Sequence, residues 1–340
     1  MQPSDIAAAD EEWLIDLCHK AENEGGMIGG EKYGDKVIKI SDNIAVKYGG
    51  VQSSEATTQE FAFNHVDRNI VHVPQVYRFI ESKKSANPHG YLFMEYVEGQ
   101  NLSNLDLEIH QDIPSRVTKI LAHLGQVIGP APIPGPIGGG EPQGYLFGDD
   151  GANTIFSSVE DLNVYMNKRL QYRNDSIDLK PYPLVLCHGD ICRRNLILEK
   201  DGSLCLVDWG YAGLYPRFFE LATISCVLPY DAAFEKPVIC EFEKLLGLTE
   251  HEKQDMKLAL CVRGANLRWS FNETQPIEAE KSSDEFFQEL LARSEKHRKE
   301  REAAGIPEFG VSSLHSGNIV SEVESHTAKP CDLSGEDMKG

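Results

Sequence analysis

The sequence predicts an α+β fold with two lobes, a small β-rich lobe followed by a larger, mainly helical one. Three observations favour it. The chain has 340 residues, 41% of them hydrophobic, which suffices to bury a core of two-lobe size. Short apolar runs separated by turn residues fill much of the first hundred positions and are typical of strands. From Val117 onward, apolar residues recur at helical spacing instead.

The first lobe is expected over residues 1–98. A short amphipathic helix is predicted at 11–21, and two antiparallel strands at 37–40 and 44–48, joined by the turn residues Ser41-Asp42-Asn43. Two further apolar runs, at 73–77 and 91–97, read as the next strands.

The second lobe is expected over residues 99–304. A helix is predicted at 117–128, and a further helix that Ser157 or Ser158 would cap and that runs to about 172. Between them, residues 129–151 are rich in Pro and Gly, which favours an irregular, solvated linker and leaves contact with the substrate open. Residues 305–340 lose apolar periodicity, so we expect a disordered tail.

Two segments of the second lobe carry the chemistry. His188-Gly189-Asp190-Ile191-Cys192-Arg193-Arg194-Asn195 follows a predicted strand at 182–186, and Leu206-Val207-Asp208-Trp209-Gly210 overlaps another at 204–207. In kinase-type phosphoryl transfer, one Asp accepts the proton of the substrate hydroxyl, while an Asn and a second Asp hold magnesium ions. The spacing predicts Asp190 as the catalytic base and Asn195 and Asp208 as ligands of Mg²⁺.

Protein kinases carry Arg between the His and Asp of this motif, whereas this chain has Gly189. With that exchange, the two segments resemble the aminoglycoside phosphotransferase and choline kinase family, and most closely its fungal phosphotransferase-domain members. The resemblance runs from about Lys36 to about Thr274. It implies a protein-kinase-like fold and ATP-dependent phosphorylation of a small hydroxylated molecule. His188 would then brace the loop instead of accepting the proton.

The resemblance also implies an ATP site. Lys47 in Ile44-Ala45-Val46-Lys47 matches the strand lysine that contacts the α and β phosphates. Its partner should be a Glu on the following helix. We expect Glu60, which precedes Phe63 and Val66 at helical spacing, and keep Glu55 as the alternative.

Residues 91–99 resemble the segment that connects the lobes. There the adenine would bond the carbonyl of Glu95 and the amide of Val97, and Met94 would line the base pocket. The glycine-rich stretch at 25–34 lacks the strict G-x-G-x-x-G pattern, so a phosphate-covering loop and a plain flexible linker stay open. Arg193 and Arg194 either offset phosphate charge or pair with acids such as Glu220.

Composition excludes several other classes. The net charge of −20 argues against nucleic-acid binding and is compatible with a cationic substrate. No run approaches 18 apolar residues and no secretory signal opens the chain, so we expect no membrane association and a cytoplasmic location. The eight cysteines form no paired C-x-x-C motif, which favours neither a zinc site nor a disulfide framework.

Two alternatives remain for function. A nucleotide-binding regulatory or scaffold protein without turnover would need no full set of Lys47, Asp190, Asn195 and Asp208. A protein kinase proper is disfavoured by Gly189 and by the lack of an Ala-Pro-Glu segment after Asp208.

Overall fold

The protein is described here by a computed structural model of residues 2–30, 34–82, 89–227, 230–271 and 296. It confirms the two-lobed α+β architecture. The predicted lobe boundary at residue 98 falls between two strands, the last of the first sheet and the first of the second lobe. The predicted tail at 305–340 lies outside the described residues, as does most of 272–304.

The first lobe contains a five-stranded antiparallel sheet in the order β1-β2-β3-β5-β4. Its strands are β1 Met27–Gly30, β2 Lys36–Ser41, β3 Ile44–Gly49, β4 Val76–Ser82 and β5 His89–Glu95. The predicted hairpin at 37–48 is confirmed, with Val37 opposite Lys47. Part of the glycine-rich stretch is β1, which pairs with β2 and so is not a plain linker there.

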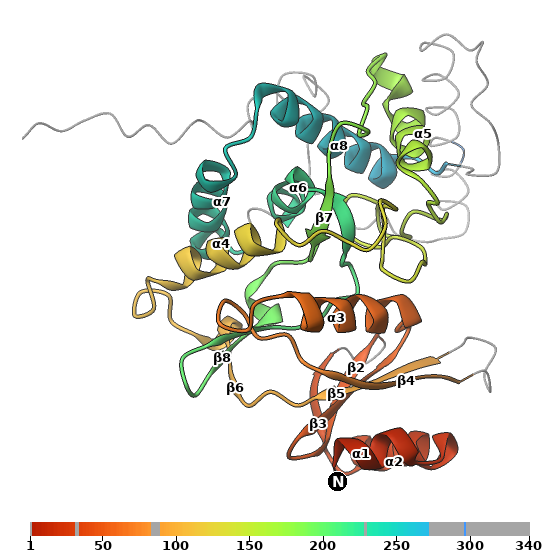
Figure 1. The fold of residues 1–340 in the computed structure, drawn as a ribbon, viewed down its shortest axis with the longest axis vertical. Coiled ribbons are helices and arrows are strands. Elements are labelled where there is room, and N and C mark those ends of the chain that lie inside the picture. The colour runs from red at the N-terminus through yellow and green to blue at the C-terminus, as the bar shows by residue number, and fades with distance from the viewer. Residues whose placement is uncertain (1, 31–33, 83–88, 228–229, 272–295, 297–340) are drawn as a thin grey trace, which may run out of the picture. The chain divides into compact units, whose positions relative to one another are not determined.

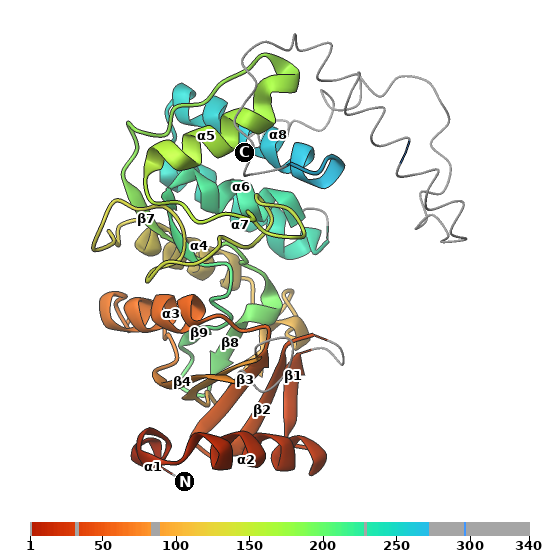
Figure 2. The ribbon, with the colours of Figure 1, turned by 90° about the vertical axis from the view of Figure 1, so that its right-hand side faces the viewer.

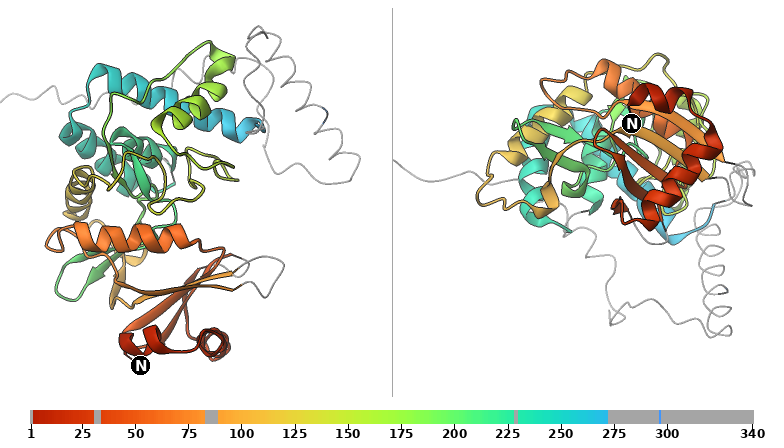
Figure 3. Two further views of the ribbon diagram at one scale, coloured as in Figure 1. Left: turned by 45° about the vertical axis from the view of Figure 1, so that its right-hand side comes forward. Right: turned by 90° about the horizontal axis from the view of Figure 1, so that it is seen from below.

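Helices cover both faces of this sheet (Figure 1). On one face lie α1 Pro3–Ala8 and α2 Glu11–Asn23, which bury Ile6 and Leu14 against Ile38 and Val46 of the strands. The guanidinium of Arg78 on β4 donates hydrogen bonds to the carbonyls of Ile6 and Ala9, which holds α1 against the sheet. On the other face lies α3 Ser53–His65, between the sheet and the helices of the second lobe (Figure 2 and Figure 3).

The second lobe is mainly helical. Its helices are α4 Ile113–Leu124, α5 Val159–Leu170, α6 Phe218–Val227, α7 Ala232–Leu246 and α8 Glu250–Arg268. They share one core with Phe218, Phe219, Phe234 and Trp209, each at most 1% exposed. Burying each such side chain contributes about 1.5–3 kcal/mol. Ser158 caps α5 by accepting from Asp161 N–H, as predicted.

Two small sheets position the loops that carry the sequence motifs. One pairs β7 Leu184–Cys187 with β10 Gly213–Pro216, and the other has the order β6-β8-β9, with strands Gly99–Asn101, Leu196–Glu199 and Leu204–Leu206. Because β7 and β9 are fully buried, the residues after them emerge at fixed positions. In the part of the chain that the structure describes, no helix is both long and apolar enough to span a membrane.

Candidate active site

A buried lysine joins the two lobes. Lys47 on β3 is 8% exposed, and its Nζ lies 2.7 Å from Glu55 Oε1 on α3 and 2.9 Å from Asp208 Oδ1 in the second lobe. Asp35 Oδ2 lies 3.8 Å from the same nitrogen. Burial opposes charging of the ammonium, but Glu55 and Asp208 outweigh it and raise the pKa of Lys47. Lys47 is therefore charged and surrounded by excess negative charge.

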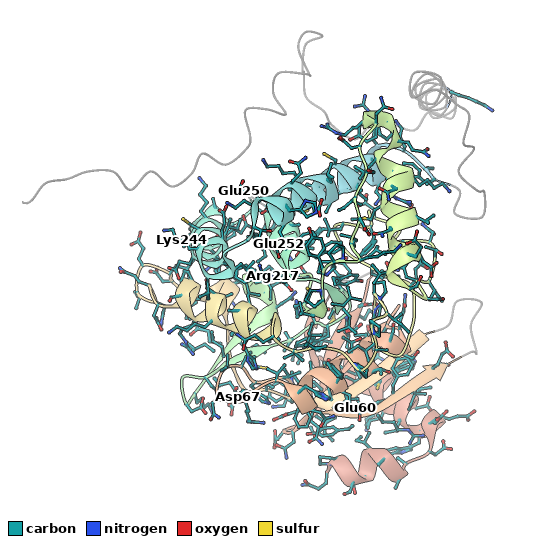
Figure 4. All side chains as sticks on the ribbon, turned by 45° about the horizontal axis from the view of Figure 1, so that its top comes forward. Glu60, Asp67, Arg217, Lys244, Glu250 and Glu252 are labelled. Carbon is teal, nitrogen blue, oxygen red and sulfur yellow. The ribbon has the colours of Figure 1, made fainter. Side chains whose placement is uncertain are left out.

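The expected pairing of Lys47 with Glu60 is wrong, and Glu55 is the partner. Glu60 is exposed on α3 (Figure 4), whereas Glu55 is 6% exposed. Five residues correspond to about 500° of helical rotation, which puts Glu60 about 140° around the helix from Glu55. Only the Glu55 side of α3 can therefore meet β3.

Asp208 follows β9 in a strained conformation. Its φ is 69°, in the left-handed region that non-glycine residues rarely adopt. Burial works against its ionisation, yet the nearby Lys47 ammonium lowers the pKa of its carboxyl. Gly210 packs on the same cluster, since a Cβ there would lie 3.2 Å from Glu55 Oε2. The turn at 208–210 thus presents an ionised carboxylate to the lysine.

The loop after β7 also depends on a glycine. Gly189 has a φ of 78°, and a Cβ there would lie 2.7 Å from the carbonyl oxygen of Tyr211. Buried Glu220 on α6 accepts the backbone N–H groups of His188 and Gly189 at 2.5 and 3.2 Å. Burial raises the pKa of Glu220 to about 7. The loop is thereby pinned to the core of the second lobe.

His188 braces this loop, as expected, and is fully buried. Its Nε2 lies 3.1 Å from the carbonyl oxygen of Val207, and its Nδ1 lies 3.3 Å from the backbone N–H of Asp190. These partners assign the proton to Nε2, so that Nδ1 accepts. Burial lowers the pKa of His188, which agrees with a neutral ring. The imidazole links the Asp190 loop to the residue before Asp208.

Each oxygen of the Asp190 carboxylate receives two hydrogen-bond donors. Tyr145 Oη donates to Oδ1 at 2.9 Å, and Asn195 Nδ2 donates to Oδ2 at 2.8 Å. Arg194 Nη2 contacts both oxygens, at 3.1 and 2.8 Å. Asp190 is 7% exposed, so these donors compensate for the water it has lost.

Asn195 and Asp208 present the oxygens that a hard cation prefers. Asn195 ends the short 3₁₀ helix Arg193–Asn195, and its amide nitrogen is used in two bonds to Asp190. Among the described residues, nothing donates to Asn195 Oδ1 or to Asp208 Oδ2. The same residues contain no group of three His, Cys, Asp or Glu suited to a metal. Two oxygens nevertheless fit Mg²⁺, which takes few protein ligands and shares the rest with phosphates and water.

The segment predicted to bind adenine lies at the end of β5. Met94 is 8% exposed and Val97 9%, so both side chains border the core. The Glu95 carboxylate is engaged by His72 and by the N–H of Gln75. No acceptor within the described residues is bonded to the backbone N–H of Val97.

Two residues at the site, Tyr145 and Asp35, have no signal in the sequence. Tyr145 lies in the segment predicted as a solvated linker, and that prediction is wrong at this position. Asp35 follows the glycine-rich stretch and accepts the N–H of Gly50 at 2.7 Å. Arg193 and Arg194 both pair with acids, which was one of the two alternatives, but their partners are Asp231 and Asp190 and not Glu220. Arg193 also donates to two backbone carbonyls. Neither Tyr145 nor Asp35 belongs to a periodic pattern that points to the site.

The fold and the site together define a two-lobed, kinase-like phosphotransferase architecture. A family model described as "Phosphotransferase enzyme family" matches residues 45–239. That range is more than half of the chain and includes Lys47, Asp190, Asn195 and Asp208. The chain belongs to this phosphotransferase family, as its motifs predicted.

Curated relatives match over a short range. A choline/ethanolamine kinase of Rattus norvegicus is 34% identical over 64 residues, which are 18% of this chain and 16% of that protein. The Mus musculus choline/ethanolamine kinase matches to the same extent. The match thus spans about a sixth of the length of these relatives.

Solved structures to which the chain is similar include aminoglycoside phosphotransferases. A thermostable mutant of APH(4)-Ia, in its apo form, is 13% identical with a TM-score of 0.48, covering 87% of this chain and 99% of that one. APH(3'')-Id from Streptomyces rimosus is 18% identical with a TM-score of 0.44, covering 76% and 99%.

Proposed function

We propose that this protein is an ATP- and Mg²⁺-dependent kinase that phosphorylates the hydroxyl group of a small molecule, with Asp190 as its catalytic base. The observation that carries the proposal is the convergence of both lobes on one site. Lys47 of the first lobe lies 2.9 Å from Asp208 of the second, and Asn195 links to the Asp190 carboxylate at 2.8 Å. Family membership supports phosphoryl transfer as the reaction class.

Nucleotide binding is assigned to Lys47 and to the end of β5. Lys47 would contact the phosphates, and Glu55 would hold its ammonium in place. The carbonyl of Glu95 and the amide of Val97 would bond the adenine edge beside Met94. Because the Glu95 side chain is engaged by His72, this residue would contribute its backbone alone.

Metal binding is assigned to Asn195 and Asp208, whose unbonded oxygens suit Mg²⁺. Bound Mg²⁺ would neutralise charge on the transferring phosphoryl group. In the protein itself, Asn195 Nδ2 and Arg194 Nη2 orient the Asp190 carboxylate. Asp190 would accept the proton of the acceptor hydroxyl, and the dissociative character of such transfers requires little basicity for this role.

The acceptor is a small hydroxylated compound, and the net charge of −20 is compatible with a cationic one. Purified protein would be incubated with ATP and Mg²⁺ against choline, ethanolamine, homoserine, kanamycin and hygromycin B, and ADP release measured. We expect ADP release that depends on an acceptor, and we expect chelation of Mg²⁺ to abolish it. A protein that binds ATP but consumes none with any hydroxylated compound would instead favour the alternative, a catalytically silent nucleotide-binding scaffold.

A further inference from the structure

The Pro- and Gly-rich segment at 129–151 is held against both lobes. The N–H of Ile137 donates to Thr58 Oγ1 on α3 at 2.9 Å. Gly135 and Leu214 of β10 exchange two backbone hydrogen bonds of 3.1 and 2.8 Å. The segment therefore connects the helix that carries Glu55 to the strand beside the Asp190 loop.

Its glycines permit this close approach. A Cβ on Gly138, whose φ is 85°, would lie 2.9 Å from Thr57 Cγ2, and one on Gly140, whose φ is 128°, would lie 2.8 Å from Ser54 Oγ. Gly144 has a φ of 107°, and a Cβ on it would lie 3.0 Å from the ring of Tyr211. Side chains at these positions would push the segment away from α3 and Tyr211.

The segment delivers Tyr145 to the catalytic loop. Its ring packs edge-on against Tyr211, with 5.8 Å between centroids. The Tyr145 hydroxyl donates a hydrogen bond to Asp190 Oδ1 at 2.9 Å and accepts one from Arg194 Nη2 at 3.4 Å. Burial and the adjacent Asp190 carboxylate raise the pKa of Tyr145, so the phenol keeps its proton.

An acceptor alcohol has to donate its hydrogen bond to Asp190 in the same way that Tyr145 does. The other two donors, Arg194 and Asn195, lie four and five residues after Asp190 on the same short loop. The conformation of this loop therefore keeps both of them close to Asp190. Tyr145 comes instead from a separate segment, 45 residues earlier in the chain. It is the donor that can leave without rearranging the catalytic loop.

We propose that Tyr145 occupies the acceptor-hydroxyl position on Asp190 and keeps water from it until an acceptor displaces the phenol. The proposal rests on the proposed kinase function. In productive transfer, the acceptor oxygen forms a bond to the γ-phosphorus, and the bond to the β,γ-bridging oxygen breaks with its electron pair left on ADP. The hydroxyl proton passes to Asp190. A water molecule at the same position would give ADP and inorganic phosphate by the same step.

The test is the release of inorganic phosphate from ATP and Mg²⁺ with no acceptor present. Tyr145→Phe keeps the ring and opens space for water beside Asp190. We expect roughly tenfold faster phosphate release than in the wild type. Tyr145→Phe combined with Asp190→Asn should lose that gain, because the added hydrolysis depends on the same base. If Tyr145 had only a structural role, Tyr145→Phe would not raise the rate of ATP hydrolysis.

Tyr182→Phe is the matched control, because Tyr182 Oη donates to the Asp255 carboxylate at 2.6 Å elsewhere in the same lobe. It removes a similar bond, and phosphate release should stay at the wild-type rate. Melting temperatures and ATP binding would be measured for every variant. Folded Tyr145→Phe that binds ATP with Mg²⁺ but hydrolyses it no faster overturns the role of Tyr145, while acceptor phosphorylation by the wild type would leave the kinase function standing. A wild type that binds no ATP overturns both.

Discussion

Lys47 Nζ lies 2.9 Å from Asp208 Oδ1, although the two residues are 161 positions apart in the chain and belong to different lobes. The contact joins the residue proposed to hold phosphates to a residue proposed to hold magnesium. Since Glu55 and Asp35 also face the lysine, the cluster carries more negative than positive charge. An incoming cation at Asp208 would relieve that excess, so we expect metal binding and nucleotide binding to be coupled.

Replacing Asp208 should uncouple magnesium from ATP. Asp208→Ala removes one of the two proposed metal oxygens, so we expect Mg²⁺ no longer to strengthen ATP binding. Titration calorimetry with and without Mg²⁺ measures this. Asp42→Ala, which removes a fully exposed carboxylate of the first lobe, is the control and should retain the enhancement. An ATP affinity of the wild type that is indifferent to Mg²⁺ would contradict the metal assignment.

The two glutamates of α3 offer a matched pair. Glu55→Gln removes the buried charge that holds Lys47, and ATP affinity should fall roughly tenfold, or about 1.4 kcal/mol. Glu60→Gln changes an exposed residue on another side of the same helix and should leave affinity unchanged. Competition binding with a fluorescent ATP analogue compares them. Equal losses in both variants would point to a general weakening of α3.

The position of Glu55 was hard to predict for a physical reason. The buried face of α3 consists largely of small or polar residues, including Ser54, Thr58 and Gln59, and part of this face meets polar groups. Thr58 accepts from Ile137, and Gln59 donates to the carbonyl of Pro74 at 2.8 Å. Hydrophobic periodicity therefore pointed to the wrong face.

The placement of Asp190, Asn195 and Asp208 in the fold is predictable from the sequence because short buried strands precede both acids. β7 ends at Cys187 and β9 at Leu206, so sequence spacing translates directly into position. Tyr145 had no such signal. It lies in an irregular segment whose path depends on distant contacts, such as those with Thr58 and Leu214, and composition cannot reveal these.

His72 should make the stability of the protein pH-dependent. It is 2% exposed, and its two nitrogens lie 2.8 Å from Glu199 of β8 and 3.1 Å from Glu95 of β5. Burial disfavours the charged ring, but the two carboxylates outweigh it and raise the pKa of His72 above its ordinary 6.5. This stabilisation is full below about pH 6.5 and is lost as the pH rises through the raised value.

Denaturant unfolding at about pH 6 and about pH 9 tests this linkage. The stability difference between the wild type and His72→Gln should be larger at the lower pH. His65→Gln, at an exposed position of α3, is the control variant. A difference that grows with pH instead would mean that His72 is neutral in the folded protein.

The pair Arg217 and Glu252 should stabilise the helical lobe (Figure 4). Arg217 donates from Nε and Nη2 to the two Glu252 oxygens at 2.7 and 2.9 Å. The hydrogen bonds with Arg217 lower the pKa of Glu252 to about 2, so this stabilisation is present above about pH 4.5 and is lost as the pH falls through about 2. Glu252→Gln should cost about 1–3 kcal/mol at neutral pH. Glu250→Gln, at the exposed first residue of α8, is the control.

Replacing Asp190 separates chemistry from nucleotide binding. Its carboxylate is bonded to Tyr145, Arg194 and Asn195, and it is assigned to the acceptor hydroxyl instead of the triphosphate. Asp190→Asn keeps the size of the side chain but replaces an accepting oxygen with an NH₂ donor. That donor would point at the donor groups of Arg194 or Asn195, with which it cannot hydrogen-bond. We expect ATP affinity to stay within about threefold and kcat on the identified acceptor to fall roughly 10²-fold or more, the scale of a positioned base. Calorimetry gives the affinity and coupled ADP release gives kcat. Near wild-type kcat would exclude Asp190 as the base, whereas a parallel loss of ATP affinity would place it in the nucleotide site.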